Sequence, residues 1–592
     1  MRSLSKICSS IFFVSFFSTV SCAKNGFVYQ DSASPYGVSY KSGFPDTNAL
    51  AYASYDITTL NTTGWAILDL KASPFVVVSR NDTLISYAAG FLEGYLTSNE
   101  IINWCENTGA SEPNSKDLQK FLDDNYAFMQ TQILNNKSIY WQHVEALLAQ
   151  VQGIADGQEA VSKATGTTTV GWFAIYNSII QGGDIFNLAQ VYGISQAQKK
   201  NSPLLARLHE SGRTFIEDIE VAGSELQIPT SRVDHCSALV KLLPGSSDLL
   251  ITHTTWSGLS NMLRILKRYE QPFSNINGKG GVPGTYTSVS SYPTYGPYSS
   301  DDFYVISPSG LVSQETTINN DNLTLAQEYA STEVVLEWAR NVLSNRLANT
   351  ASEWTNIFSE HHSGTYTNSW MILDTKLFTP GSSLQPNTLL VLEEMPGFIA
   401  THDRTNILQD QTYWSSFNVP SDSFIFNVSG QQLLVDKYGG IGGDGAFFSF
   451  QNTSRSRIFQ RDAPLVVDDM SFENLIRYNN APYDPFSKIA CGNSNDYSFA
   501  NAIADRSDLN IRGNKCIGGG KSASGAIDAK YTKASWIKAS KPSDVPLRVK
   551  SGPTNDSPSC PTFSFLNATV NTPHVGLPDT YNFPWIQAPW LG

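Results

Sequence analysis

Hydrophobic positions between Ile85 and Gly157 recur every three or four residues, the spacing of amphipathic helices. SYAAGFLEGYLTSNEIINWCENTG, DLQKFLDDNYAFMQTQILNN and YWQHVEALLAQVQGIADG each carry this pattern, and a further helix is expected from Trp172 to Gln190. In residues 23–80, GVSYKSG, GWAILDLKA and FVVVSRN are rich in β-forming residues and predict strands.

The stretch from Cys236 to Trp256 predicts a β-hairpin. CSALVKLL is an apolar, strand-like run, PGSSD has turn chemistry, and LLITHTTW is again rich in β-formers. From Cys236 onward we expect mainly strands, with helices at Leu259 to Tyr269 and Leu325 to Leu347. The whole pattern predicts an α+β protein or a layered sandwich.

Composition narrows the class of protein. Of the 592 residues, 41% are hydrophobic and only 16% are charged, which is typical of a globular chain and not of a disordered one. Aromatic residues make up 12%, enough to line an apolar pocket. The net charge of -13 argues against a nucleic-acid partner.

The N-terminus looks like a targeting segment. Arg2 and Lys6 precede the apolar run ICSSIFFVSFFSTV, and Val20-Ser21-Cys22 offers a small-residue cleavage site, so residues 1–22 are predicted to be a signal peptide. No later stretch reaches the roughly 20 apolar residues of a membrane span. We therefore expect a secretory-pathway protein without a transmembrane segment, secreted or in the lysosomal lumen. Eight N-x-S/T sequons agree with this: Asn61, Asn81, Asn136, Asn322, Asn427, Asn452, Asn555 and Asn567.

Five cysteines remain after the predicted signal: Cys105, Cys236, Cys491, Cys516 and Cys560. An odd number in an oxidising compartment leaves at least one thiol unpaired. Cys491 and Cys516 flank a polar loop and are the expected disulfide, with Cys560 as a competing partner. Cys236 is either a buried structural thiol or a nucleophile, and spacing alone does not decide.

The segment before Cys236 favours the nucleophile. KKNSPLLARLHESGRTFIEDIEVAGSELQIPTSRVDH is polar and lacks periodicity, as expected of a linker or an exposed loop. If the peptide bond before Cys236 were cut, the new chain would begin with a thiol and a free α-amine on one residue. With an ordinary pKa of about 8, that amine can act as the base for its own side chain.

Several motifs, in order along the chain, resemble the phospholipase B-like (lamina-ancestor-like) family. They are HCSALVKLLPGSSDLLITHTTW, SSDDFYVISPSGLVSQETTINN, WMILDTKLFTPG, EEMPGFIATHDRTNIL, YWSSFNVP, IFNVSG, RYNNAPYDP and ADRSDLN. The resemblance implies an αββα sandwich of the N-terminal-nucleophile hydrolase type and cleavage between His235 and Cys236. It divides the chain into an N-terminal part (23–210), a linker or propeptide-like segment (211–235) and a C-terminal part (236–592), which stay associated after cleavage.

The resemblance also implies an active site. Cys236 is its nucleophile, and Asn418 donates to the oxyanion. His253, Trp256 and Thr317 belong to the wall, and Arg455 takes a polar position for which Arg457 is the alternative.

The predicted hairpin tests these assignments unevenly. A simple hairpin places Trp256 across from Cys236. Side chains, however, point to alternate faces along a strand. His253 and Trp256, three residues apart, therefore both face Cys236 only with a bulge or twist. Otherwise His253 lies behind the site, as a hydrogen-bonded strand histidine. Trp256 equally suits plain core packing, and Asn418 suits a turn cap before Val-Pro.

No cofactor or metal is expected. GGIGGDGAFF lacks the Lys-Ser or Lys-Thr of a phosphate-binding loop, and H-E-x-x-H and paired Cys-x-x-Cys motifs are absent.

The resemblance implies a hydrolase that removes fatty acyl chains from glycerophospholipids. The same nucleophile also suits an N-acyl amide hydrolase, and a lipid-binding protein with little catalysis is the non-enzymatic alternative.

Overall fold

A computed structural model of the chain describes residues 23–31, 37–72, 81–110, 114–192, 236–274, 281–300, 303–437, 448–489, 496–511, 520–568 and 572–591. The predicted signal peptide, His235, the segment 211–235, Cys491, Cys516 and the first six residues of FVVVSRN lie outside these ranges. Among the described residues, no helix is both long and apolar enough to cross a membrane.

The larger of two main sheets has eleven strands. In spatial order they are β14 (Phe398–Asp403), β13 (Leu389–Met395), β12 (Asn368–Asp374), β11 (Leu311–Thr317), β10 (Phe303–Ser307), β9 (Tyr286–Ser291), β8 (Ile265–Glu270), β4 (Ala66–Ala72), β3 (Ala49–Asp56), β1 (Lys24–Gln30) and β2 (Val38–Ser42). GVSYKSG and GWAILDLKA form β2 and β4, as predicted. β4 pairs in parallel with β8, so this sheet joins segments from both sides of Cys236.

The smaller sheet has six strands and contains the predicted hairpin. Its order is β15 (Tyr413–Ser416), β5 (Ser237–Leu242), β6 (Leu249–Thr254), β17 (Asp528–Lys533), β18 (Arg548–Ser551) and β21 (Ile586–Gln587). β5 and β6 are antiparallel and are joined by a turn at Pro244–Ser246. Two short ribbons complete the strands: β7 (Trp256–Gly258) with β16 (Ser524–Ala526), and β19 (Phe563–Ser564) with β20 (Thr580–Tyr581).

The helices fall into an N-terminal group and a set after β11. The first group is α1 (Leu60–Thr63), α2 (Asp82–Leu96), α3 (Ser98–Thr108), α4 (Lys116–Asn135), α5 (Ile139–Thr165), α6 (Gly171–Gln181) and α7 (Ile185–Tyr192). The second set is α11 (Leu323–Tyr329), α12 (Glu337–Leu347), α13 (Ala351–Ser359), α14 (Thr405–Gln411), α15 (Ser423–Val428), α16 (Gln431–Lys437), α17 (Ser454–Asp462), α18 (Asp469–Ile476) and α19 (Ala534–Ala539).

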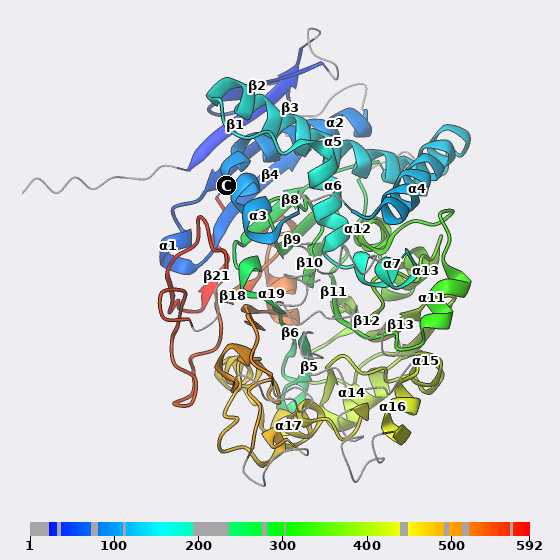
Figure 1. Cartoon of the computed structure of the whole chain (residues 1–592), viewed down its shortest axis with the longest axis vertical. Helices are drawn as coiled ribbons and strands as arrows, with labels where there is room; N and C mark the ends of the chain where they lie inside the picture. The colour runs from blue at the N-terminus through cyan, green and yellow to red at the C-terminus, as the bar shows by residue number, and fades with distance from the viewer. Residues whose placement is uncertain are drawn as a thin grey trace, which may run out of the picture.

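Figure 1 shows how the strands and helices are arranged. Three clusters of apolar side chains hold these elements together in layers. Helices α2, α5 and α13 pack on one face of the eleven-stranded sheet. The other face packs against the six-stranded sheet through side chains such as Val312, Ala238 and Ile251. Helices α17 and α18 cover the outer face of the smaller sheet. The chain is therefore an α+β protein in which two sheets lie face to face between helices.

Three helix predictions need correction. The segment Trp172 to Gln190 forms two helices, α6 and α7, because Gly182 and Gly183 separate them. A Cβ on Gly183 would lie 2.3 Å from the Tyr366 ring, so the chain packs too closely there for a larger residue. Leu325 to Leu347 is likewise split into α11 and α12.

The predicted helix Leu259 to Tyr269 is wrong, since it holds a short 3₁₀ turn and then strand β8. β8 is buried on both faces, and the charges of Lys267 and Arg268 are matched by Glu93 and Asp69. Because charged and apolar residues are interspersed in this buried strand, the sequence resembles the pattern of an amphipathic helix. The expectation of mainly strands after Cys236 also missed α13 to α19, which have only six to nine residues each.

Candidate functional site

Cys236 lies immediately before β5, in the gap between the two sheets. The hairpin register pairs Ser237 with Thr254 and Ala238 with His253. Ala238 faces the core between the sheets, and paired residues share a face, so His253 points into the same layer. The Cys236 side chain is a thiol with only 4% of its surface exposed. A buried cysteine thus stands at the end of a strand with an imidazole beside it.

The strand ends one residue after His253. β6 ends at Thr254, and Thr255 leaves the ladder: its N–H donates to Asp528 Oδ1 at 3.1 Å. The chain resumes as β7, which pairs with β16 in a separate ribbon. This break is the irregularity that the sequence required for His253 and Trp256 to approach the same site.

Trp256 is held as a packing residue. Its indole Nε1 donates to the Ile503 carbonyl at 3.1 Å, and its ring packs with small residues: Ala500, Ala504 and Ala526. The guanidinium of Arg455 lies 4.4 Å from the ring centroid. Trp256 therefore supports Arg455 by a cation–π contact.

Arg455 contacts the backbone of Cys236. It lies in the first turn of α17, and its Nη1 donates to the Cys236 carbonyl at 2.9 Å and to Ser237 Oγ at 3.3 Å. Burial lowers the pKa of this guanidinium, and the charges of Cys236 and Asp505 oppose that shift. Arg457 is exposed and bonds Asn452 Oδ1 at 3.5 Å. Of the two arginines considered, Arg455 is the one at Cys236.

Glu315 completes a cluster that the sequence prediction missed. Three buried side chains meet here: those of Cys236, His253 and Glu315. The Cys236 sulfur, one ring nitrogen of His253 and one carboxylate oxygen of Glu315 all lie within 4.8 Å of one another. Tyr366 donates from its hydroxyl to Glu315 Oε1 at 3.2 Å. A signal was present: in SQETTINN, Glu315 is two positions from Thr317 and shares its face of the strand.

The cluster combines sulfur, nitrogen and oxygen donors, which are the ligand types of zinc. His253 and Glu315 lie in separate strands and Cys236 lies just before a third, so no local motif such as H-E-x-x-H reports them. The expectation of no metal rested on the absence of such motifs and remains a prediction.

Burial, and after it two neighbouring cations, disfavour a positive charge on His253. Burial lowers the pKa of His253 well below its ordinary value, Lys530 and Arg264 lower it further, and the backbone of Glu315 acts in the opposite direction. Asp528 lies between the two cations, 3.2 Å from Arg264 Nη1 and 3.1 Å from Lys530 Nζ. The lowered pKa favours the uncharged imidazole, which has a lone pair for a proton but binds that proton weakly unless a negative group stabilises it.

Asn418 is fixed two residues after the end of β15. Its φ of 70° is left-handed, a conformation that asparagine tolerates better than most residues. Its Nδ2 donates to the Thr317 carbonyl at 2.6 Å, while its Oδ1 is buried without a hydrogen-bond partner in the described residues. Thr316 and Ser416 share a 2.6 Å hydrogen bond just beside it. Asn418 thus ties the small sheet to the end of β11, the strand that carries Glu315.

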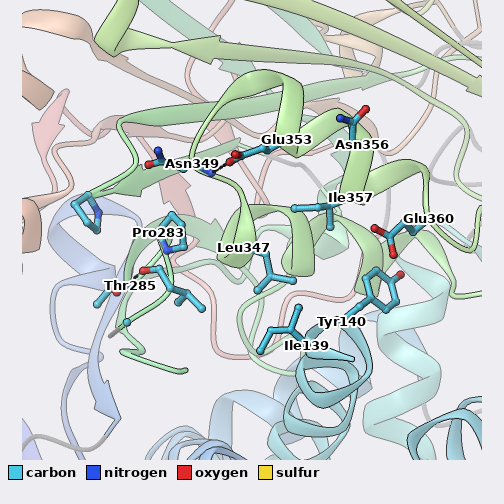
Figure 2. A pocket seen from close by; sticks show the side chains of 13 residues that line it. Ile139, Tyr140, Pro283, Thr285, Leu347, Asn349, Glu353, Asn356, Ile357 and Glu360 are labelled. Carbon is cyan, nitrogen blue, oxygen red and sulfur yellow. Dashed lines mark hydrogen bonds between the residues drawn. The ribbon is translucent and has the colours of Figure 1, made fainter. Parts of the chain in front are cut away.

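A separate cavity of about 640 Å³ lies among the helices (Figure 2). Tyr140 and Ile139 of α5, Leu347 of α12 and Ile357 of α13 line it, with Glu353 and Glu360 among its polar residues. None of the candidate site residues is part of its wall.

The predicted glycosylation sites lie at the surface. Asn61, Asn81, Asn136, Asn427 and Asn567 are exposed, and Asn322, Asn452 and Asn555 are partly exposed, so none of the eight sequons is buried. Cys105 and Cys560 are buried thiols. The predicted pair Cys491–Cys516 lies outside the described residues.

Comparison with known proteins identifies relatives along nearly the whole chain. A family model described as Phospholipase B matches residues 51–588. "Putative phospholipase B-like 2" of Homo sapiens is 35% identical over 562 residues, covering 92% of this chain and 86% of that protein. "Phospholipase B-like protein D" of Dictyostelium discoideum is 33% identical over 557 residues, covering 91% and 87%. The chain therefore belongs to the phospholipase B family, as its motifs predicted.

Proposed function

We propose that this protein is an acyl hydrolase that removes fatty acyl chains from glycerophospholipids, with Cys236 as its nucleophile after cleavage of the His235–Cys236 bond. Membership of the phospholipase B family supports the lipid substrate. The observation that carries the nucleophile is the setting of Cys236: a thiol at a strand end, its carbonyl held by Arg455 at 2.9 Å.

The layered architecture supports the same proposal. Two face-to-face sheets between helical layers, with a candidate nucleophile at the head of a strand, fit an αββα sandwich of the N-terminal-nucleophile hydrolase type. The parallel pairing of β4 with β8 would hold the two fragments together after cleavage, because it joins strands from both. The unburied sequons support passage through the secretory pathway, to the cell exterior or the lysosome.

The reaction follows from the chemistry of a chain-terminal cysteine. The α-amine takes the thiol proton, and the thiolate attacks the acyl carbonyl carbon. Asn418 Nδ2, already oriented by the Thr317 carbonyl, retains a second N–H to donate to the oxyanion. The amine returns its proton to the departing lysophospholipid alcohol, and water hydrolyses the thioester, releasing the fatty acid.

The test uses purified, cleaved protein at acidic pH with a glycerophospholipid labelled on both acyl chains and, separately, an N-acyl amide. We expect the wild type to release both fatty acids from the lipid. The Cys236→Ser variant should retain only a small residual activity. Fatty-acid release from the amide alone would show that the protein is an N-acyl amide hydrolase and not a phospholipase. Release from neither substrate would leave a lipid-binding protein.

A further inference from the structure

The uncleaved chain lacks the base that the cleaved enzyme uses. Before cleavage, the nitrogen of Cys236 is part of a peptide bond, and its lone pair is delocalised into the carbonyl. It has no capacity to take a proton from the thiol. If the chain cuts itself through Cys236, another group must accept that proton in this first reaction.

The cluster around Cys236 offers such a group. His253 and Glu315 each bring an atom within 4.8 Å of the Cys236 sulfur and of one another. Both are completely buried, at 0% exposure, so bulk water does not compete for their protons. A thiol, an imidazole and a carboxylate in mutual proximity form the set of roles found in cysteine nucleophile triads.

Resting on the function proposed above, we propose that His253 is the base for self-cleavage of the chain and that Glu315 is its positioning residue. His253 contributes the proton-accepting nitrogen. Glu315 contributes the negative charge that stabilises the imidazolium once it forms. The α-amine takes over as base only after the cut, for the turnover of substrate.

The surroundings explain why Glu315 is necessary. Lys530 and Arg264 both disfavour a positive charge on His253, as does burial itself. Asp528 is engaged by both of these cations. The carboxylate of Glu315 lies within 4.8 Å of the imidazole, and Tyr366 donates a 3.2 Å hydrogen bond to it. Without Glu315, the imidazolium intermediate would form in a positively charged, dry environment.

Self-cleavage begins with a proton transfer from Cys236 to His253. The Sγ–H proton moves to His253, and the thiolate attacks the carbonyl carbon of residue 235. The C–N bond breaks, His253 returns the proton to the departing α-nitrogen, and a thioester links residue 235 to Sγ. Water then hydrolyses the thioester: its hydroxide joins the carbonyl carbon of residue 235, and its remaining proton restores the thiol or the α-amine. The Arg455 contact to the Cys236 carbonyl fixes the backbone throughout.

The test separates self-cleavage from turnover. In one series, the full chain carries Glu315→Gln, Glu315→Asp or Tyr366→Phe, and conversion of precursor to fragments is followed over time. In a second series, the residues before Cys236 are replaced by the recognition sequence of a site-specific protease, which exposes Cys236 without self-cleavage. Turnover of labelled phospholipid is then measured for the same substitutions.

We expect Glu315→Gln to slow self-cleavage on the order of 100-fold, within the usual range for a lost acid–base partner. Its effect on turnover after protease cleavage should be at least tenfold smaller. Glu315→Asp should recover part of the self-cleavage rate because the carboxylate is retained, and a merely structural role would not give this pattern. Thermal unfolding of each precursor checks that the variants are folded.

Two results would overturn the inference. One is self-cleavage of Glu315→Gln at the wild-type rate. The other is an equal or larger loss in turnover after protease cleavage, which would make Glu315 a residue of the main reaction. A wild-type chain that is never cut before Cys236 would instead refute the proposed function, so the two failures are distinguishable.

Discussion

Replacing Arg455 by alanine removes the contact that holds the candidate nucleophile in place. The side chain donates to the Cys236 carbonyl at 2.9 Å and to Ser237 Oγ at 3.3 Å, and it stacks on Trp256 at 4.4 Å. If this contact positions the sulfur for attack, both self-cleavage and turnover depend on it. Arg457 provides the matched control, since it lies in the same helix but is exposed.

The size of the effect follows from these contacts. A hydrogen bond from a charged donor contributes about 1.5–3 kcal/mol. The cation–π contact adds about 0.5–2 kcal/mol. A combined loss of about 3 kcal/mol, expressed in the barrier to attack, corresponds to roughly a 100-fold slower reaction. Arg455→Lys keeps the charge but not the planar fork, so it should fall between wild type and alanine.

The assay measures precursor conversion by gel and phospholipid turnover of the cleaved fraction. We expect Arg455→Ala to be slower by about 100-fold in both reactions. Arg457→Ala should match wild type in both. Equal rates for the two alanine variants would refute the idea that Arg455 positions Cys236.

Three further predictions concern other residues. Asn418→Gly should lower kcat by about 10²–10³ with little change in KM, because it removes an oxyanion donor without straining the left-handed backbone; a full-activity variant would exclude this role. Burial raises the pKa of Asp184 from its ordinary 3.8 to about 6. The stabilising contribution of protonated Asp184 is therefore complete below pH 3.8 and is lost as pH rises through about 6. In urea unfolding, the free energy of unfolding of the wild type, relative to that of Asp184→Asn, should fall by about 1 kcal/mol from pH 5 to pH 7. Asn356→Trp places a large ring at the wall of the 640 Å³ cavity and should leave turnover unchanged, because none of the candidate site residues lines this cavity. A loss of activity would show that the substrate binds in that cavity.

Long elements could be predicted from the sequence. Helices α4 and α5, with 20 and 27 residues, give several turns of apolar repeat, and the β5–β6 hairpin has distinct turn chemistry between two apolar runs. Short elements could not, because a helix such as α17, with nine residues, holds barely two turns of periodicity. β8 misled the prediction because its charged residues are buried in ion pairs rather than exposed.

The site could be predicted only in part. The motifs pointed to Cys236 and Arg455, which the fold brings together. Glu315 escaped because its proximity to Cys236 depends on how β11 of the large sheet faces the head of β5 in the small one. That relation is a property of sheet packing, and the one local signal was the position of Glu315 two residues before Thr317 on the same face of the strand. The break at Thr255 is similar, since it depends on Asp528 from a distant strand.

The most direct test of the account is the N-terminal sequence of the larger fragment of the purified protein. We predict that it reads Cys-Ser-Ala-Leu-Val, beginning at Cys236, and that this fragment remains bound to the smaller one. A fully active protein whose peptide bond before Cys236 is intact would contradict the account.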